Sequence, residues 1–356
     1  MDDEDLKYWL AIDKTQIIGP KRMPILLEYF KEVKNIWEAP EQELLRVGLN
    51  RTTAKLFLEK KRTICPDKLL PILEKLKVKP ITLNNPDYPI LLKHIPDPPI
   101  VIYIRGNTNL NVEGVGIVGT RKATNYGHSI AFEFAREISK YGISINSGLA
   151  IGIDSYSHKG ALDSKGRTIA VLGSSIDRIY PAVNFQIAQK ILGHEGSIIS
   201  EYPPGTPGGK YQFVGRNRII AGLSKGVLVV EAPEKSGALI TADFALEQGR
   251  EVYAIPGDIL NKNSIGPNNL IKNGAKIVTK ALDILEDFDI KENEKASINL
   301  SELEERILEC LNEPKGINEI VKELSLNVTD IGSQMTLMEL DGLVTNRGGS
   351  MYSKNI

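Results

Sequence analysis

The chain has 356 residues, of which 42% are hydrophobic and 25% charged, values typical of soluble globular proteins with two or three domains. Its 44 Lys and Arg nearly balance 45 Asp and Glu, no run of 18 apolar residues predicts a membrane span, and the acidic start MDDEDLKYWL does not resemble a signal peptide. The only cysteines are Cys65 and Cys310, which argues against a disulfide framework or zinc site and fits a reducing cytoplasm.

The first 80 residues predict short helices, because apolar side chains recur every three to four positions in LLEYFKEV, EQELLRVG and TTAKLFLEKK. Glycine turns at 17–22 and 47–52 separate the helices. A glycine turn with basic residues between two helices is typical of a helix-hairpin-helix or SAM-like module, whose turn amides can hold a phosphate. An ordinary helical bundle explains the pattern at least as well, because the usual second glycine is missing.

The middle of the chain predicts a Rossmann-like α/β domain. A proline-rich segment, 84–107, leads into it and contains the strand-like run IVIYI. Continuous apolar strands that alternate with helices indicate a parallel, doubly wound sheet whose ligands bind at the carboxyl ends of the strands. The predicted strands are 115–119, 142–148, 168–173, 196–201, 226–232 and 251–257.

The last part of the chain predicts a small separate domain. Three helical patterns, SELEERILECL, GINEIVKEL and VTDIGSQMTLMELDGLV, precede the hairpin-like run LVTNRGGSMYSK, which together suggest a winged helix. The sequence therefore predicts four parts: a helical domain at 1–82, the Rossmann-like domain at 83–288, a charged linker at 289–300 and a winged-helix-like domain at 301–356.

Charge is distributed unevenly along the chain. Residues 81–282 carry 21 basic and 16 acidic side chains, whereas residues 283–356 carry 7 basic and 16 acidic side chains. No acidic residue lies between Tyr202 and Val230. An anionic ligand is therefore expected at the middle of the chain and not at its tail.

Two predicted strand-end loops could bind phosphate. The loop GIVGTRKATNYG (116–127) joins a strand to a helix, where backbone amides and the helix dipole favour an anion. It lacks the GxGxxG pattern, and the second strand ends in NSGLA without a ribose-binding acid, so NAD is disfavoured. A tight turn with a surface arginine is the alternative. The candidate contacts are Gly119, Thr120 and Arg121, with Ser147 and Gly148 from the next loop.

Asp154 and His158 are spaced four residues apart, on one face of a predicted helix that follows Ser147. No third metal ligand lies nearby, and the GxSxG elbow of hydrolases is absent. We therefore favour a structural hydrogen bond between this carboxylate and imidazole, and predict neither a catalytic residue nor a metal site.

The segment EYPPGTPGGKYQFVGRNR (201–218) combines cations for phosphates with aromatic rings, Tyr211 and Phe213, on which bases can stack. This density of charge, together with Arg121 and Lys122, suits several nucleotides better than one. An internal salt-bridge cluster is the alternative for the RNR triplet. In KSGALITADFA, the small residues could bind an anion or cap a helix. The candidates are Lys210, Phe213, Arg216, Asn217 and Arg218, with Ser236 and Gly237.

These motifs together resemble the DprA (Smf) family of DNA-processing proteins. The resemblance rests on YPILLKHIPDPPIVIYIRGN, GIVGTR, SGLAIGID, RNRIIAGLS, EAPEKSGALITA, REVYAIPG and SIGPNNLIKNGA. The chain departs from the family in GSSIDRIYP, which lacks a second glycine, and in FVGRNR, which lacks a proline after the phenylalanine.

The resemblance implies a cytoplasmic protein without enzymatic activity or cofactor. Family members bind single-stranded DNA, work alongside single-strand-binding protein and load the RecA recombinase in natural transformation (competence) and homologous recombination, and their central domains pair as homodimers. The family's DNA-contacting positions correspond here to Arg121, Lys210 and Phe213, and also to Arg216 and Arg218.

Two other functions were weighed. A nucleotide-processing enzyme of the phosphoribohydrolase type would carry a PGGxGTxxE motif, which is absent. A winged-helix transcription factor would carry base-reading side chains, but VTDIGSQMTLMEL contains neither Arg nor Lys, and the tail from residue 301 has a net charge of about −5. We therefore interpret the tail as a protein-interaction module.

Overall fold

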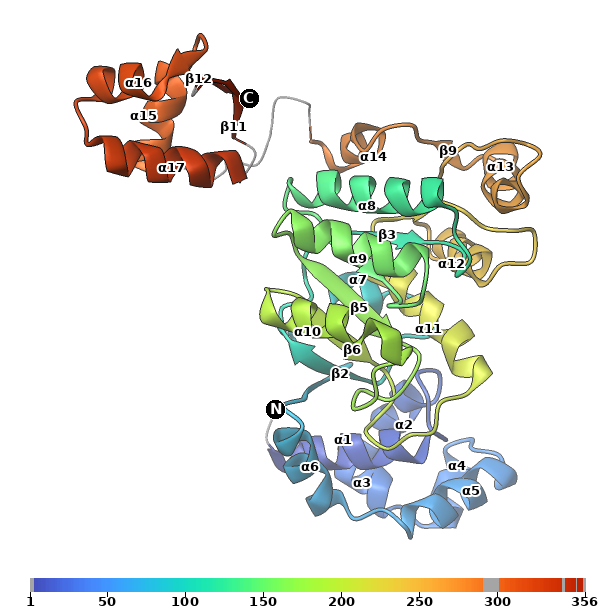
Figure 1. The fold of residues 1–356 in the computed structure, drawn as a ribbon. Coiled ribbons are helices and arrows are strands. Elements are labelled where there is room, and N and C mark those ends of the chain that lie inside the picture. Colours follow the sequence, from blue (N-terminus) through green and yellow to red (C-terminus); the bar gives the residue numbers. More distant parts are fainter. Residues whose placement is uncertain (1–2, 291–300, 341–342, 350, 355–356) are drawn as a thin grey trace. The chain divides into compact units, whose positions relative to one another are not determined.

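The structure, a computed structural model, describes residues 3–290, 301–340, 343–349 and 351–354 (Figure 1). It consists of two compact units, Met1–Asn293 and Glu294–Ile356. The first unit contains both the N-terminal helices and the central sheet, and the proposed boundaries at residues 82, 288 and 300 remain predictions. The predicted linker lies mostly at 291–300, outside the described residues.

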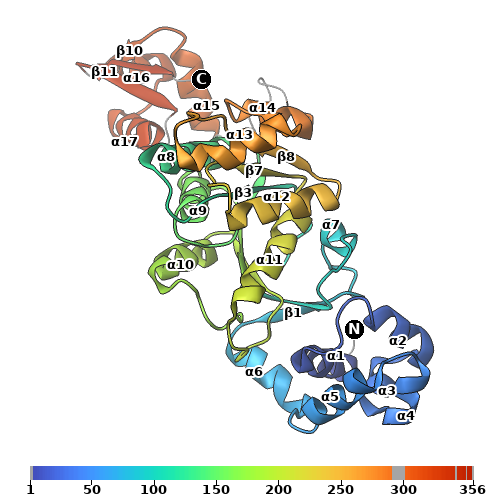
Figure 2. The ribbon, with the colours of Figure 1, turned by 90° about the vertical axis from the view of Figure 1, so that its right-hand side faces the viewer.

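The N-terminal residues form short helices that share a buried core (Figure 2). Trp9, Ile12, Leu26, Ile36 and Phe57 are all nearly inaccessible to solvent. Burial of such large apolar side chains is the main force that holds short helices together. The helices are α1 (Asp3–Thr15), α2 (Met23–Phe30), α3 (Val33–Glu38), α4 (Glu41–Arg46), α5 (Arg51–Lys61) and α6 (Leu69–Lys75), with a 3-10 turn, η1 (Pro66–Lys68).

The central sheet has nine strands in the order β1-β2-β6-β5-β4-β3-β7-β8-β9. The seven strands from β6 to β9 in this order are parallel, and β1 and β2 extend the sheet in antiparallel fashion. The strands are β1 (Lys79–Thr82), β2 (Val101–Gly106), β3 (Gly114–Val118), β4 (Ser144–Ser147), β5 (Thr168–Leu172), β6 (Ser197–Ser200), β7 (Gly226–Val229), β8 (Glu251–Ala254) and β9 (Lys276–Ile277).

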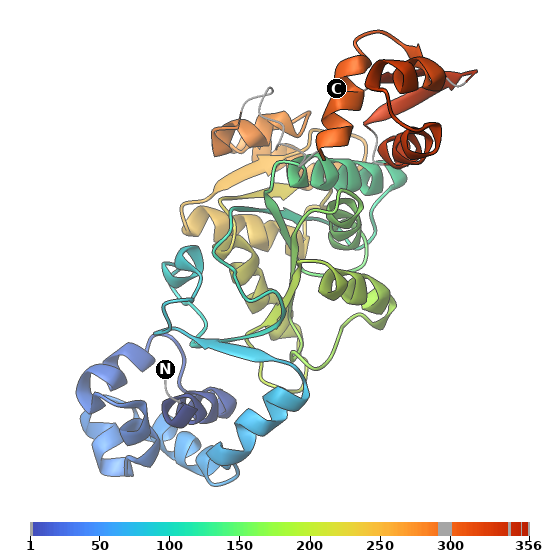
Figure 3. The ribbon, with the colours of Figure 1, turned by 90° about the vertical axis from the view of Figure 1, so that its left-hand side faces the viewer.

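Helices cover both faces of this sheet, as Figures 2 and 3 show. Strand side chains alternate between the two layers: Val171 packs in the same cluster as Ile219 of α11, whereas Leu172 packs with Ile187 of α10. One layer contains α8 (Asn125–Ser139), α9 (Ile153–Asp163) and α10 (Phe185–Gly193); the other contains α11 (Lys210–Gly222), α12 (Gly237–Glu247) and α13 (Ile265–Lys272). The predicted α/β class with a doubly wound, mostly parallel sheet is confirmed.

Strand order reverses beside β3, because the chain proceeds from β3 through β4 and β5 to β6 on one side and then returns to β7 on the other. In doubly wound sheets, ligands bind at the carboxyl edge beside such a reversal. Short connecting elements complete the unit: α7 (Ile90–Lys93), α14 (Leu282–Leu285), η2 (Ala182–Asn184), η3 (Lys262–Ser264) and η4 (Glu286–Phe288).

The second unit has its own small core of Ile307, Leu311, Ile320, Ile331 and Met335. Three helices and a three-stranded antiparallel sheet surround it, in the strand order β10-β12-β11. The elements are α15 (Glu302–Cys310), α16 (Ile317–Leu324), α17 (Val328–Leu340), β10 (Lys315–Gly316), β11 (Val344–Gly348) and β12 (Met351–Lys354). Assignment of this unit as a winged helix remains a prediction. Among the described residues, no helix has the length and apolarity that crossing a membrane requires.

Candidate nucleic-acid interface

The predicted binding residues gather at the carboxyl edge of the parallel sheet. Parallel strands end at the same edge, so the loops after β3, β4, β5, β6 and β7 all lie there. Gly119–Arg121 follow β3, Ser147 and Gly148 lie at the end of β4, Lys210–Arg218 lie in α11 after β6, and Ser236 and Gly237 follow β7. Within this set, the structure separates exposed side chains from residues that maintain the fold.

The loop after β3 is tied to the end of β7 by Glu231. The Thr120 N–H donates to the Glu231 backbone oxygen (2.7 Å), and the Glu231 carboxylate accepts from the Thr124 N–H (2.8 Å) and hydroxyl (2.6 Å). A side chain at Gly127 would collide with this carboxylate, because an added Cβ would lie 2.4 Å from Glu231 Oε2. These hydrogen bonds hold the loop against the end of β7, and the exposed side chains of Arg121 and Lys122 extend from it.

This arrangement corrects the expected role of Thr120. Its amide already donates to Glu231, and Thr120 is only 8% exposed, so that amide does not point at a phosphate. A side chain at Gly119 would lie 2.4 Å from Ile153 Cγ1, which shows that Gly119 allows α9 to pack closely against the loop. The loop presents the exposed side chains of Arg121 and Lys122 to an anion.

Ser147 and Gly148 also serve the fold. The Ser147 hydroxyl is buried and donates to the Ile117 backbone oxygen (2.7 Å), which joins β4 to β3. The Gly148 N–H donates to Asp154 Oδ2 (3.1 Å), and its carbonyl oxygen accepts from Arg216 Nη1 (2.6 Å). An added Cβ at Gly148 would lie 2.3 Å from Arg216 Nη1, so a larger residue here would displace the guanidinium.

Arg216 is buried and links the ends of β4 and β5 by hydrogen bonds. It is 5% exposed, and its Nη1 donates to the backbone oxygens of Gly148 and Val171. Burial lowers the pKa of Arg216 to about 10, although the nearby Asp154 carboxylate opposes this shift. The guanidinium is therefore charged at neutral pH, with the Asp154 carboxylate as its nearby opposite charge.

Arg218 and Asn217 belong to an internal network, the alternative considered for the RNR triplet. Arg218 Nε lies 2.9 Å from Asp97 Oδ2, and its Nη2 lies 2.5 Å from Glu201 Oε2. Burial alone would lower the pKa of Arg218, but these two carboxylates outweigh burial and raise it. Asn217 Nδ2 donates to the Gly237 backbone oxygen (3.1 Å). The structure thus does not present the side chains of Arg218 and Asn217 to DNA.

Lys210 and Phe213, in contrast, lie in the first turn of α11 at the surface. Lys210 is exposed and forms no ion pair with another described residue, and the neighbouring Tyr211 is 91% exposed. Phe213 is partly buried, with one side of its ring against Gly173, where an added Cβ would lie 2.5 Å from Phe213 Cδ1. The ring is thus held at the surface and is not part of a closed core.

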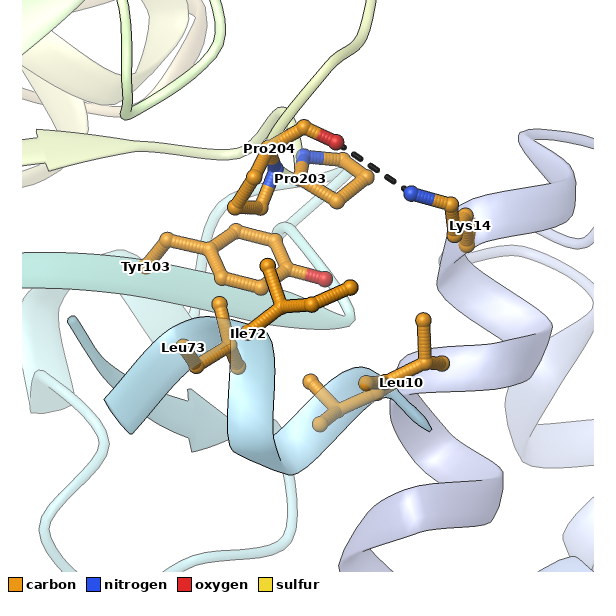
Figure 4. Close-up of a pocket in the computed structure, with 8 residues that line it drawn as sticks. Leu10, Lys14, Ile72, Leu73, Tyr103, Pro203 and Pro204 are labelled. Carbon is orange, nitrogen blue, oxygen red and sulfur yellow. Dashed lines mark hydrogen bonds between the residues drawn. The ribbon is translucent and has the colours of Figure 1, made fainter. Parts of the chain in front are cut away.

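The loop that leads to Lys210, residues 201–209, is anchored by the N-terminal helices (Figure 4). Lys14 Nζ donates to the Pro204 backbone oxygen (3.2 Å), and Pro203 and Pro204 line a small apolar pocket with Tyr103 of β2. On the other side, the Gly205 N–H donates to Asp177 Oδ1 (3.2 Å). These contacts restrict the positions available to Lys210.

Beneath this pocket, Asp13 of α1 accepts a hydrogen bond from the Tyr103 hydroxyl (2.7 Å). Burial is the main cause that raises the pKa of Asp13 to about 8; the bond from Tyr103 opposes this shift, and the Glu201 charge adds to it. Asp13 is therefore largely protonated at pH 7, and α1 packs on the sheet without burying a full negative charge.

Ser236 caps α12, because its side-chain oxygen accepts from the Ala238 N–H (3.3 Å). The Gly237 backbone oxygen is occupied by Asn217, as described above. Of the two predicted roles of this turn, helix capping is the one for which the structure shows a contact.

The predicted hydrogen bond between Asp154 and His158 is wrong. The Asp154 carboxylate instead accepts from the amides of Gly148 (3.1 Å) and Ala150 (3.4 Å). His158 Nδ1 lies 2.7 Å from Thr168 Oγ1, whose hydroxyl donates to the Ile145 backbone oxygen, so the imidazole is the donor. Its Nε2 has no hydrogen-bond partner among the residues that the structure describes. Burial lowers the pKa of His158 to about 3, so the ring is neutral.

The model of the DNA recombination-mediator protein A family matches residues 79–289. The chain belongs to this family. A relative from Synechocystis named Protein Smf is 33% identical and covers 99% of this chain and 100% of its own length. DNA processing protein DprA from Bacillus subtilis is 46% identical over 59% of this chain and 71% of that protein.

Solved structures of relatives show the same fold. DprA from Streptococcus pneumoniae is 34% identical and matches with a TM-score of 0.70 over 82% of this chain and 99% of that one. DNA processing protein A from Helicobacter pylori, whose structure addresses a single-stranded DNA binding mode, is 29% identical, with a TM-score of 0.54 over 60% of this chain and 95% of that one.

Three residues that anchor the site of this recombination-mediator family member were not predicted from its sequence: Glu231, Asp97 and Lys14. Glu231 lies two residues after the end of β7, so a carboxylate at the carboxyl edge could have been noticed from the run GVLVVEA. Asp97 binds Arg218 of α11, which lies 121 positions later, and Lys14 binds Pro204 in the preceding loop, 190 positions later. No local sequence pattern indicates such contacts.

Proposed function

We propose that this protein binds single-stranded DNA at the carboxyl edge of its central sheet. The observation that carries the proposal is the surface made by Arg121, Lys122, Lys210 and Phe213, where exposed cations that form no ion pair with another described residue lie on anchored segments with an aromatic ring. The single-stranded DNA binding mode of the Helicobacter pylori relative supports it.

The chemistry of this surface favours a single strand over a duplex. Lysine and arginine pair with backbone phosphates of either form. An aromatic ring can stack on a base only where that base is free of its helical neighbours, as in a single strand. The positive charge that attracts the phosphates comes from the exposed side chains of Arg121, Lys122 and Lys210.

We further propose that the bound strand is delivered to a RecA recombinase in homologous recombination and natural transformation, with single-strand-binding protein as a second partner. The family's description as recombination mediators supports this step. The test is strand exchange by the recombinase on DNA coated with single-strand-binding protein. The chain should shorten the lag of the reaction, and a variant with Lys210→Ala and Phe213→Ala should not. An unchanged lag with the intact chain would refute loading.

We also propose that the chain is not an enzyme. His158 is buried and neutral, and the Asp154 carboxylate accepts hydrogen bonds from two backbone amides. Neither side chain is therefore placed to exchange a proton with a substrate. Incubation with nucleoside monophosphates should release no free base. Release that His158→Ala abolishes would overturn this assignment.

A homodimer formed by the central domain is the last part of the proposal. Exposed apolar side chains after β8 and in β9 support it: Ile259, Leu260 and Ile277 are 84%, 87% and 52% exposed. Sedimentation should show a dimer that Leu260→Asp weakens. A monomer at all concentrations would contradict it.

A further inference from the structure

The loop between β5 and α10, residues 173–184, exposes the aromatic ring of Tyr180, which is not part of the DNA surface proposed above. Tyr180 is 48% exposed, more than Phe213, and Val183 and Phe185 beside it are 71% and 49% exposed. The Tyr180 hydroxyl makes no hydrogen bond with another described residue. Single exposed rings are common on protein surfaces, so the case for Tyr180 depends on what lies beside it.

The position of this ring connects it to the DNA surface. The centroids of the Tyr180 and Phe213 rings are 5.3 Å apart, and their planes are tilted by 48°. The two rings are therefore neighbours but are not stacked on each other, so neither uses its whole face on the other. Phe213 comes from α11 and Tyr180 from the loop after β5, so two separate segments together build one aromatic surface.

The loop that carries Tyr180 is held firmly in place. The Ser174 hydroxyl donates to the Arg178 backbone oxygen (2.6 Å), and the Ser200 hydroxyl donates to that of Ser174 (2.7 Å). Asn184 Nδ2 donates to the Leu149 backbone oxygen (2.8 Å) at the other end of the loop. A ring that is already positioned loses little conformational entropy on binding, which favours tight contact.

Charges around the two rings also suit a nucleotide strand. Arg178 precedes Tyr180 by two residues, Lys210 precedes Phe213 by three, and both are exposed. Asp177 is the nearby acidic residue, and its carboxylate accepts from the Gly205 N–H. Cations next to exposed rings match an alternation of phosphates and bases along a single strand.

We propose that Tyr180 is a second base-stacking position, which binds the nucleobase adjacent to the one on Phe213. This inference rests on the proposed single-stranded DNA binding and specifies how it occurs. Two adjoining rings would hold consecutive bases, so the site would recognise a dinucleotide step of any sequence.

The test compares two fluorescein-labelled oligonucleotides of equal length: oligodeoxythymidine, and the same backbone with abasic sites. Base stacking contributes about 1–3 kcal/mol per base, so Tyr180→Ala and Tyr180→Leu should weaken binding of the first about 5- to 150-fold. Binding of the abasic strand should not change. Tyr180→Phe keeps the ring and should bind as the wild type does.

The chain supplies a matched control in Tyr29, which is 46% exposed and packs against Phe30 with ring centroids 4.9 Å apart. Tyr29→Ala removes a similar exposed tyrosine from α2, and DNA affinity should stay the same. Equal losses for Tyr29→Ala and Tyr180→Ala, or losses by Tyr180→Ala that are equal on abasic and base-bearing strands, would overturn the inference.

A second readout does not depend on affinity. In Tyr180→Trp, the new indole should be quenched when oligodeoxythymidine saturates the protein, while the buried Trp9 and Trp37, 2% and 7% exposed, provide a constant background. Unchanged fluorescence at saturation refutes stacking at Tyr180. Failure of the wild type to bind either strand refutes the proposed function itself, which is a distinguishable result.

Discussion

Replacing Arg216 tests whether this arginine maintains the fold or contacts DNA. In Arg216→Met, the backbone oxygens of Gly148 and Val171 lose their buried donor, and the Asp154 carboxylate loses a nearby positive charge. Removing one member of a buried charged cluster costs about 3–5 kcal/mol. At about 2–4 °C per kcal/mol for a domain of this size, the melting temperature should fall by roughly 6–20 °C.

Two measurements on the same sample separate the roles of Arg216. Urea unfolding followed by circular dichroism reports the free energy of unfolding, and fluorescence anisotropy below the melting transition reports affinity for oligodeoxythymidine. We expect the affinity to change less than about tenfold, or about 1.4 kcal/mol. The reasoning is refuted if the unfolding free energy stays within about 1 kcal/mol of wild type while affinity falls more than tenfold.

Arg136→Met is the matched control for Arg216→Met. Arg136 is a half-exposed arginine of α8 that pairs with Glu133 and Asp163 at 3.4 Å each. Exposed ion pairs contribute about 0–1 kcal/mol, so this control should melt close to the wild type.

Three further predictions concern Lys210, Asp13 and the C-terminal unit. Lys210→Ala should reduce the slope of log K against log salt by about 0.7, the value for one phosphate contact on a single strand, and an unchanged slope would exclude that contact. Folded Asp13 has a pKa of about 8 against an ordinary 3.8, so unfolding releases a proton and stability falls as pH rises between these values, by at most about 1.4 kcal/mol per pH unit. Asp13→Asn should flatten this fall in urea titrations, and an unchanged pH profile would contradict a protonated Asp13. Deleting residues 301–356, whose net charge is about −5, should leave the affinity for single-stranded DNA within tenfold; a larger loss in a folded protein would place that unit at the DNA site.

The sheet and the edge that carries the site could be predicted from sequence because their signals are local. Runs such as VGIVG and TIAVLG are apolar at nearly every position, as strands buried on both faces must be, and β3 and β5 are buried throughout. The loop 119–121 follows directly from β3, so its place at the carboxyl edge could be predicted once the strand was predicted.

The roles of individual side chains could not be predicted, because they depend on partners distant in sequence. Arg216 and Arg218 are two positions apart, yet one binds strand-end carbonyls and the other binds Asp97, 121 positions earlier. The Asp154–His158 pair has helical spacing, but Asp154 turns back to its own loop while His158 contacts Thr168 on the sheet. Helical spacing brings two side chains onto one face and does not decide which other groups compete for them.

The most direct test of the account is the affinity for oligodeoxythymidine against that for a duplex of equal length, measured by anisotropy at two salt concentrations. Phosphate contacts weaken with salt in both forms, whereas stacking of Phe213 is available only to the single strand. We predict tighter binding of the single strand at both concentrations, with the advantage reduced in Phe213→Ala. Equal affinity for the two forms at matched salt would contradict a surface built to bind exposed bases.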